Sequence, residues 1–423
     1  MEKVQTPFHV QTLCSDSSCY LVKDVLGEGC FGKVAKCFDF ATCTTVAVKI
    51  DKTSFNNKTP YEIAILKELQ TIDPDKKNIV KFMESFRFED FSCLVFEMLD
   101  KSLWDLMMER QRAPMSLNEI RPITHQLLVA FDALKDLGII HTDLKLDNIM
   151  LVNHSQQPYK IKLIDFGLAR PEGTVEPGTI MQPLPFRAPE VTLGLPISTA
   201  VDMWSLGCVM ANLYFAALLF PDNCEYNWVK VMLHLLGQPH MNLLAAGDYT
   251  WMFFTWEWDL ADPNFRFNSP QEYQAFTGYT PQVSHEFFQK VKSLDDVVLT
   301  GPSKPSAPEF EDRIAFLNLL KCILNVNASK RIRPREALNH SFITLAHLAG
   351  KSETTSYLDI AAQLMTVSNQ YNLHQSADQS WDNITNVQGR SYRESPHTVC
   401  DFQTYRPCHL WCPFKASKTV TKL

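Results

Sequence analysis

Two short segments carry side chains that could transfer a phosphoryl group. Residues 141–148 read HTDLKLDN, and seventeen residues after Asn148 an aspartate, Asp165, opens the sequence DFG. Transfer from a magnesium nucleotide needs an acceptor for the hydroxyl proton, a cation beside the transferred group and oxygen ligands for the metal. The candidates for these roles are Asp143, Lys145, Asn148 and Asp165. A solvated loop of charged residues is the plain alternative, but it gives no reason for four such groups at this spacing.

A glycine-rich turn precedes these segments. Residues 27–34 read GEGCFGKV, and glycines at the first, third and sixth positions let the backbone approach phosphate oxygens. This pattern alone is a weak signal, because a dinucleotide-binding turn and a plain hairpin also produce it. A dinucleotide-binding turn opens a helix, whereas Val34 and Ala35 lead into another β-rich run. We therefore expect the loop to join two strands.

A lysine follows at a strand position. Lys49 ends the run VAVK, fifteen residues after Val34. A lysine on an inward-facing strand position needs a counter-charge or an anionic ligand, because burying an unpaired ammonium is costly. Glu62, in the helical stretch that follows, can supply the counter-charge. A surface lysine on an edge strand is the alternative that Lys49 alone leaves open.

The elements that must position these groups change in type along the chain. β-branched runs predict strands over residues 20–97, interrupted by a helical stretch at 61–69. Apolar residues at helical spacing, as in 123–137, predict helices over most of residues 100–345. We therefore expect two lobes with a ligand-binding cleft between them. The other predicted segments are an N-terminal arm (1–19), an insertion (about 222–316) and a polar, loosely structured tail (346–423).

Composition restricts the class of protein. Of 423 residues, 45% are hydrophobic and 21% charged, with a net charge of -7, so bulk electrostatics give no reason to bind nucleic acid or anionic lipid. The polar start lacks the apolar stretch of a secretory signal. The most apolar run, residues 204–220, is interrupted by Asn212 and is too short to span a bilayer, so it predicts a buried helix. We expect an intracellular protein without membrane contacts, whose twelve cysteines remain thiols.

Taken in order, the motifs resemble those of eukaryotic protein kinases over residues 20–342, about three quarters of the chain. They are the glycine loop, VAVK at 46–49, HTD at 141–143, DFG at 165–167, APE at 188–190 and DMWSLG at 202–207. Within the CMGC group the chain is most similar to the homeodomain-interacting protein kinases of the dual-specificity tyrosine-regulated kinase family. That similarity is carried by LVFEML at 94–99, PI at 122–123, NIMLV at 148–152, LGLP at 193–196, DMWSLGC at 202–208 and the insertion after Pro221.

The resemblance implies an α+β, bilobal protein kinase fold, with a small β-rich lobe (20–97), a larger helical lobe (100–345) and an ATP cleft between them. The implied enzyme transfers the γ-phosphoryl group of ATP, with Mg²⁺, to serine or threonine hydroxyls of protein substrates. Its implied catalytic residues are Lys49, Glu62, Asp143 and Lys145, and its magnesium ligands are Asn148 and Asp165. Lys49 would hold the α and β phosphates, Asp143 would accept the hydroxyl proton and Lys145 would steady the γ-phosphoryl group.

The resemblance also implies an ATP site and a frame around it. The implied ATP-binding residues are Leu26, Gly27, Glu28, Gly29, Phe31, Gly32, Val34, Ala47, Lys49, Phe96, Glu97, Leu99 and Asp105. Among them, Phe96 would be the gatekeeper behind the adenine, and Asp105 would meet the ribose. The implied structural groups are a spine of Leu66, Phe82, His141 and Phe166, and an ion pair between Glu190 and Arg331.

Three departures concern regulation and substrate docking. Thr142 stands where protein kinases usually have an arginine, which would gather a phosphate on the activation loop, although the homeodomain-interacting protein kinases that the chain resembles also lack this arginine. Ile180 occupies the position of the self-phosphorylated tyrosine, so autophosphorylation there is impossible. Leu184 and Pro185 replace a basic and an aromatic residue of the substrate-docking surface. Arg187 remains and predicts a preference for proline after the target residue.

Some interpretations stay open. A catalytically weak scaffold, or pseudokinase, fits the altered activation segment, but pseudokinases commonly lose a lysine or metal position and none is lost here. Nuclear localisation and binding of transcriptional regulators follow only from the resemblance, and the relatives' long partner-binding regions cannot be assigned to this chain. The basic run KRIRPR at 330–335 reads as a structural turn rather than a nuclear import signal. The irregular spacing of His397, Cys400, Cys408, His409 and Cys412 weighs against a zinc site.

Overall fold

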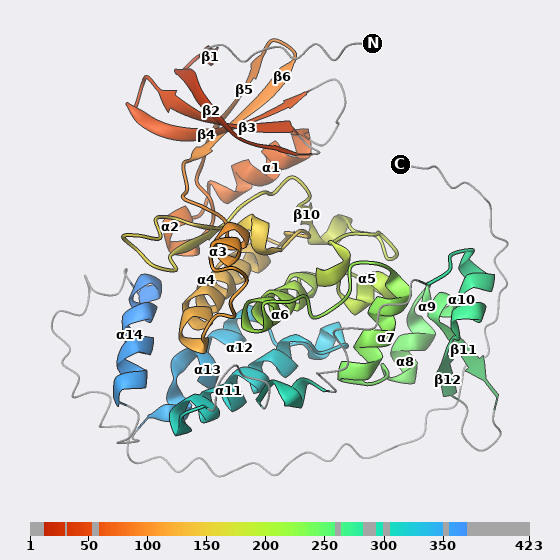
Figure 1. Ribbon diagram of the computed structural model, residues 1–423. Helices are drawn as coiled ribbons and strands as arrows, with labels where there is room; N and C mark the ends of the chain where they lie inside the picture. Colours follow the sequence, from red (N-terminus) through yellow and green to blue (C-terminus); the bar gives the residue numbers. More distant parts are fainter. Residues whose placement is uncertain are drawn as a thin grey trace. The chain divides into compact units, whose positions relative to one another are not determined.

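The computed structural model describes residues 12–29, 32–52, 59–258, 264–281, 293–298, 305–349 and 355–369, which belong to one compact unit (Figure 1). The strands are β1 (Thr12–Cys14), β2 (Cys19–Gly29), β3 (Gly32–Asp39), β4 (Thr44–Lys52), β5 (Phe82–Phe88), β6 (Phe91–Glu97), β7 (Ile139–Ile140), β8 (Ile149–Leu151), β9 (Ile161–Leu163), β10 (Arg170–Pro171), β11 (Phe254–Glu257) and β12 (Asn264–Phe267). The helices are α1 (Thr59–Leu69), α2 (Pro74–Lys77), α3 (Leu103–Glu109), α4 (Leu117–Asp136), α5 (Pro189–Leu193), α6 (Ala200–Phe215), α7 (Glu225–Leu236), α8 (Met241–Ala246), α9 (Thr250–Phe253), α10 (Pro270–Thr277), α11 (Ala307–Ile323), α12 (Pro334–Leu338), α13 (Ser341–Thr344) and α14 (Thr355–Asn369).

The small lobe is an antiparallel sheet in the order β1-β2-β3-β4-β6-β5, with α1 beside it (Figure 1). Successive side chains of a strand point to opposite faces. On β4, Val46 and Val48 are buried in one apolar cluster of the sheet. Ala47 and Lys49 alternate with these valines and therefore point to the opposite face of the sheet, which carries the candidate lysine for phosphoryl transfer.

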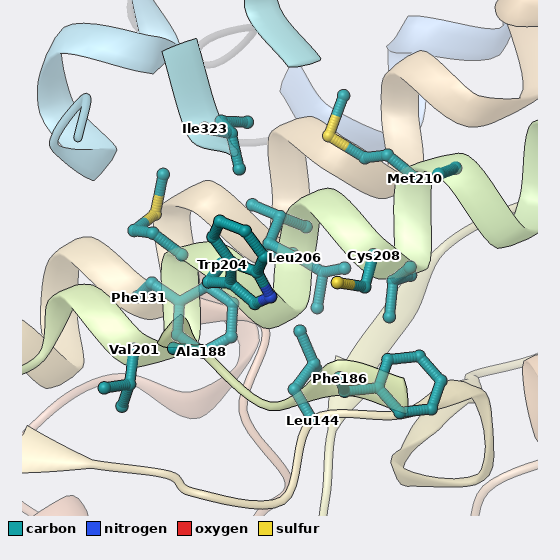
Figure 2. Close-up of a cluster of buried hydrophobic side chains, with 14 of the residues drawn as sticks. Phe131, Leu144, Phe186, Ala188, Val201, Trp204, Leu206, Cys208, Met210 and Ile323 are labelled. Atoms are coloured by element: carbon teal, nitrogen blue, oxygen red, sulfur yellow. The ribbon is translucent and has the colours of Figure 1, made fainter. Parts of the chain in front are cut away.

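Helix α6 is the centre of the helical lobe. Its sequence is apolar on all sides, which is typical of a helix buried in the core of a large domain. Trp204 of α6 is fully buried and lies among Phe131 of α4, Ala188 and Ile323 of α11 (Figure 2). The buried helix predicted in the run 204–220 is thus present, and among the described residues no helix is long and apolar enough to cross a membrane.

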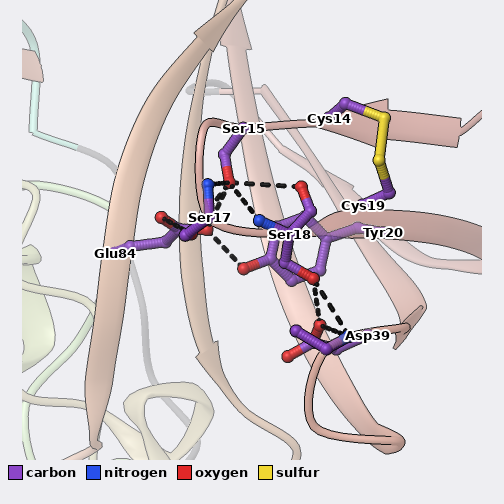
Figure 3. The surroundings of a disulfide bond; sticks show 9 residues. Cys14, Ser15, Ser17, Ser18, Cys19, Tyr20, Asp39 and Glu84 are labelled. Atoms are coloured by element: carbon purple, nitrogen blue, oxygen red, sulfur yellow. Dashed lines mark hydrogen bonds between the residues drawn. A yellow bond between two sulfur atoms is a disulfide. The ribbon is translucent and has the colours of Figure 1, made fainter.

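The N-terminal region differs from the predicted arm. Strand β1 pairs with β2, so the sheet begins before residue 20. Cys14 and Cys19 face each other in this hairpin with Cα atoms 4.2 Å apart, and they form a disulfide (Figure 3). The prediction that all cysteines are thiols is wrong for this pair, because it rested on composition and could not see the register that brings two sulfurs together. Glu84 of β5 steadies the hairpin by accepting hydrogen bonds from Ser15 and Ser17 at 2.8 and 2.7 Å.

The insertion and the tail contain more regular structure than the sequence predicted. The segment from 222 to 316 holds α7 to α10, the β11–β12 hairpin and the first half of α11. In the tail, α14 packs against α4, with Ala361 buried and the Tyr357 hydroxyl donating to Asp312 at 2.7 Å. The sequence of α14 contains several apolar residues, and the polar composition of the tail as a whole hid this helix. The candidate zinc ligands, from His397 onward, lie outside the described residues.

Candidate active site

Lys49 lies between two carboxylates where the sheet meets the helical lobe. Its Nζ is 2.7 Å from Oε1 of Glu62 in α1 and 3.2 Å from Oδ1 of Asp165. Burial alone would lower the pKa of Lys49, but the carboxylates of Asp165 and Glu62 outweigh it and raise the pKa, so the ammonium stays charged. Strand β4 is central in the sheet, which rules out the edge-strand alternative. Lys49, Glu62 and Asp165 are called the phosphate cluster below.

Asp143, Lys145 and Asn148 form a second group, called the base cluster below. Oδ2 of Asp143 accepts hydrogen bonds from Lys145 Nζ at 2.8 Å and Asn148 Nδ2 at 2.9 Å. Asn148 Nδ2 also donates to the Asp143 carbonyl at 2.8 Å. Oδ1 of Asp143 accepts no hydrogen bond from the described part of the chain, so this oxygen is available to accept one.

Asp202 of α6 fixes the backbone of the loop at residues 141–148. Its carboxylate accepts the backbone N–H groups of His141 at 2.7 Å and Thr142 at 3.0 Å. Thr142 and Asp165 have φ of 69° and 60°, in the left-handed region that non-glycine residues rarely adopt, and such conformations persist only when their surroundings hold them. The Thr142 hydroxyl donates to the Leu168 carbonyl at 2.8 Å, so it ties this loop to the next one. Sequence reasoning quoted the motif around Asp202 but gave the carboxylate no role.

The predicted spine connects the two lobes. The rings of His141 and Phe166 meet edge-on with centroids 5.0 Å apart. His141 Nε2 is 2.9 Å from the Ile164 carbonyl, which orients the ring. Leu66, Phe82 and Phe166 are all buried in one apolar core that runs from α1 and β5 into the helical lobe. The spine therefore keeps the phosphate and base clusters in one arrangement.

The glycine loop joins β2 and β3, which pair up to Gly29 opposite Gly32. This is the predicted strand-to-strand loop, and it excludes the dinucleotide-binding turn. A Cβ on Gly32, whose φ is 142°, would lie 2.3 Å from a carboxylate oxygen of Asp51, so only glycine fits here. Phe31 lies outside the described residues.

The remaining predicted ATP-binding residues that the structure describes lie on four strands of the sheet and at the start of the helical lobe. They are Leu26, Gly27 and Glu28 on β2, Val34 on β3, Ala47 on β4, Phe96 and Glu97 on β6, Leu99 in the connection to α3, and Asp105 in α3. Ala47 lies opposite Phe96 in the sheet, and the Phe96 ring packs on Phe82 at 5.6 Å. The Asp105 carboxylate caps its own helix by accepting the Ser102 N–H at 3.0 Å and hydroxyl at 2.6 Å.

A buried lysine connects the end of β6 to the helical lobe, and sequence reasoning missed it. Lys162 of β9 is only 1% exposed, and its Nζ is 2.5 Å from Oε1 of Glu97 and 2.5 Å from Oδ1 of Asp75. Two carboxylates offset the cost of burying one ammonium. The run KIKLI at 160–164, a lysine inside an apolar strand, was the signal for such partners. Sequence reasoning named Glu97 only as an implied ATP-binding residue.

The activation segment, residues 165–190, is held near its end by Arg187. Gln182 has a φ of 63°, and its carbonyl accepts hydrogen bonds from Nε and Nη2 of Arg187 at 3.3 and 3.2 Å. Arg187 also pairs with Glu225 of α7. The Gln182 side chain donates to the Ser205 hydroxyl at 2.8 Å, which anchors the turn to α6. The sequence singled out Arg187 but not Gln182.

Beyond the activation segment, the predicted ion pair is present and buried. Arg331 donates to both carboxylate oxygens of Glu190, at 2.7 and 2.9 Å. Nearby, Arg335 lies 2.9 Å from Asp132 and 3.1 Å from Asp136. Two arginines of the basic run at 330–335 thus have structural partners, as predicted.

The oxygen atoms at the site fit a divalent metal. Asn148 uses its Nδ2 toward Asp143, so its carboxamide oxygen is left without a donor among the described residues. Asp165 uses Oδ1 toward Lys49 and the Gly167 N–H, at 3.2 and 3.3 Å, which leaves Oδ2. Amide and carboxylate oxygens are the ligands that Mg²⁺ prefers. The residues present therefore suit a metal-bound nucleoside triphosphate.

Comparison with known proteins gives the family. The protein kinase domain model matches residues 20–343. The chain is 37% identical to homeodomain-interacting protein kinase 2 of Mesocricetus auratus over 88% of this chain and 32% of the relative. It is 39% identical to homeodomain-interacting protein kinase 1 of Mus musculus (80% of this chain, 28% of the relative) and 35% identical to homeodomain-interacting protein kinase 4 of Homo sapiens (83% and 59%). The chain spans less than a third of the length of the first two of these relatives. Since the family match covers more than half of the chain, this protein belongs to the protein kinase family.

Proposed function

We propose that this chain is an ATP-dependent protein kinase that phosphorylates serine and threonine residues and favours proline after the target. The observation that carries the proposal is that the phosphate cluster and the base cluster are both complete and are tied to one spine. The resemblance to homeodomain-interacting protein kinases supports the choice of serine and threonine over tyrosine.

Each side chain has a role that its contacts allow. Bound ATP with Mg²⁺ supplies the phosphoryl group and neutralises much of its charge. The Lys49 ammonium, kept charged by its neighbours, would hold the phosphates, and Asn148 with Asp165 would hold the metal. Oδ1 of Asp143 would orient the substrate hydroxyl and take its proton, while Lys145, 2.8 Å from Oδ2, would stabilise the charge on the transferred group.

The backbone at Gln182 supports the proline preference. Its carbonyl already accepts two hydrogen bonds from Arg187 and is therefore not offered to a substrate. If the substrate residue after the target has a backbone N–H, that N–H finds no acceptor at Gln182 and stays unpaired. An unpaired N–H is unfavourable when the group is desolvated. Proline has no N–H and loses nothing there.

Phosphate transfer to a generic basic protein tests the proposal. Purified protein with Mg²⁺ and labelled ATP should give phosphoserine and phosphothreonine. Asp143→Asn should reduce kcat by about 100-fold or more, since a positioned base contributes about 10²–10⁴. Asp147→Asn, an exposed carboxylate in the same loop, is the matched control and should keep activity. No transfer by wild-type protein would favour the pseudokinase alternative, and equal activity of Asp143→Asn would refute the assigned site.

Paired peptides that differ only in proline or alanine after the serine test the preference. Arg187→Ala frees the Gln182 carbonyl and should reduce the proline-to-alanine ratio of kcat/KM by about 2- to 12-fold, the value of one hydrogen bond. Glu225→Gln removes the ion pair but leaves the bonds to Gln182, so it should keep the ratio. A ratio that is near one in wild-type protein would end this part of the proposal.

The relatives' names also suggest partners, and the family resemblance suggests a location. We infer that substrates include transcriptional regulators, homeodomain proteins among them, and that the protein acts in the nucleus. The support is the resemblance alone, because the chain covers a minor part of the first relatives. Co-precipitation with homeodomain proteins and imaging of a fluorescent fusion test it, and an exclusively cytoplasmic fusion would contradict the nuclear assignment.

A further inference from the structure

A tyrosine of the insertion contacts the middle of the activation segment. The hydroxyl of Tyr249, between α8 and α9, donates a hydrogen bond to the Gly178 carbonyl at 3.0 Å. Gly178 has a φ of +81°, and a Cβ placed on it would lie 2.6 Å from that hydroxyl oxygen. Glycine is therefore required both by the backbone conformation and by the approach of the tyrosine. Because both features exclude a side chain at residue 178, the contact between Tyr249 and Gly178 is a specific feature of this fold.

The tyrosine is itself held firmly. Its N–H donates to the Leu193 carbonyl at 3.0 Å, and its carbonyl accepts the Met252 N–H at 3.1 Å. A Cβ on Gly194, the left-handed residue that ends α5, would lie 3.1 Å from the Tyr249 ring. Helix α5 lies beside the segment that carries Tyr249 (Figure 1). The hydroxyl is thus a donor at a fixed position relative to α5.

The activation segment lacks the usual charged anchor at this point. Ile180, two residues from Gly178, is 71% exposed and can carry no phosphate. Thr142 brings a hydroxyl instead of the cation that would bind one, and it is already engaged with the segment's backbone. Arg187, a cation within the segment, is engaged with Glu225. The segment is therefore held neither by a phosphate at residue 180 nor by a cation at residue 142.

We propose that Tyr249 is a positioning residue whose hydroxyl holds the activation segment in its substrate-binding arrangement in place of a phosphate. The inference rests on the proposed kinase function. It implies an enzyme that is active as synthesised, without phosphorylation of its activation segment. Because the part of the segment around Gly178 lies beyond the metal-binding Asp165 and would meet the protein substrate, losing this hydrogen bond should affect the KM for peptide and leave the KM for ATP unchanged.

Tyr249→Phe tests this in bacterially expressed protein that mass spectrometry shows to be free of phosphate on residues 165–190. The variant keeps the ring and removes one hydrogen bond, so the peptide KM should rise by about 2- to 12-fold. The KM for ATP and the melting temperature should stay close to wild type. Tyr226→Phe is the matched control, since its hydroxyl donates at 2.8 Å to the carbonyl of Asn268, which belongs to the insertion and not to the segment. It should leave the peptide KM unchanged.

A double-mutant cycle separates positioning from general stability. Gly178→Ala should raise the peptide KM strongly, because the added methyl group meets the Tyr249 hydroxyl. In the Tyr249→Phe background the same change should cost several-fold less, because the closest clashing atom is gone. Additive effects would overturn the assignment.

Two further measurements decide the remaining alternatives. Hydrogen exchange around Gly178 should be faster in Tyr249→Phe than in wild type, and this readout works even without activity. If wild-type protein transfers no phosphate but the exchange difference is present, the proposed function fails while the contact stands. If wild-type protein is active and Tyr249→Phe matches it in both peptide KM and exchange, the inference alone fails. Loss of wild-type activity on phosphatase treatment would also refute it, because the segment would then depend on a phosphate.

Discussion

Asp51→Asn should stabilise the protein at neutral pH, although it removes a buried charged group. Asp51 lies on β4, two residues after Lys49 and on the same face of the strand, and is 6% exposed. Its Oδ1 accepts no hydrogen bond within the described residues. Burial raises its pKa to about 6, and the nearby carboxylates of Glu62 and Asp165 add to the rise while Lys49 opposes it.

The size of the effect follows from the pKa. An aspartate that titrates at 3.8 when unfolded and at about 6 when folded binds more protons in the folded state, so stability falls as pH rises through this window. Each pKa unit corresponds to about 1.4 kcal/mol, so the ionised side chain costs about 3 kcal/mol above pH 7 and about half of that at pH 5. Removing the charge should therefore raise the melting temperature at pH 7.5 by about 3–6 °C.

Thermal unfolding between pH 5 and 8 measures this. The difference between Asp51→Asn and wild type should be largest above pH 7 and shrink toward pH 5. Asp39→Asn is a control of opposite sign in the same sheet. Burial alone would raise the pKa of Asp39, but hydrogen bonds from Ser18, Thr42 and the Ala41 N–H outweigh it and lower the pKa, so this variant should destabilise. A lower melting temperature for Asp51→Asn at pH 7.5, or a pH-independent difference, would refute the reasoning.

Two other predictions concern buried contacts of the helical lobe. Glu190→Gln should reduce the free energy of unfolding by about 3 kcal/mol or more, because it leaves the buried guanidinium of Arg331 without its counter-charge; unfolding in urea measures this, and an unchanged midpoint would contradict it. Tyr357→Phe should speed hydrogen exchange in α14 with little change in global stability, because it removes the hydroxyl that donates to Asp312, and equal exchange in both proteins would show that α14 does not depend on that bond.

The chemistry of the site could be predicted because its determinants are short in sequence. The base cluster lies within six residues, so the backbone of one loop brings Asp143, Lys145 and Asn148 together. The pairing of Lys49 with Glu62 followed from the need of a buried ammonium for a counter-charge, a physical demand that the nearest helix could meet. The strand-to-strand glycine loop followed from what comes after it in the chain. Each of these inferences needs little knowledge of the tertiary structure.

Contacts between distant segments could not be predicted in this way. Tyr249 and Gly178 are 71 residues apart, and neither a tyrosine nor a glycine in polar sequence indicates a partner. The same holds for the disulfide, because the sequence alone did not reveal the hairpin register that brings Cys14 and Cys19 together. At such places a residue departs from its usual local conformation or environment, and a contact with a distant segment compensates for this. Only the structure shows such a contact. Gly178 has a backbone conformation that suits only glycine and a tyrosine hydroxyl that fills the space of a side chain. Asp51 is the informative exception, because Lys49 offsets the burial of its carboxylate only in part and Oδ1 accepts no hydrogen bond among the described residues, and for that reason it is the position at which stability should be gained by mutation.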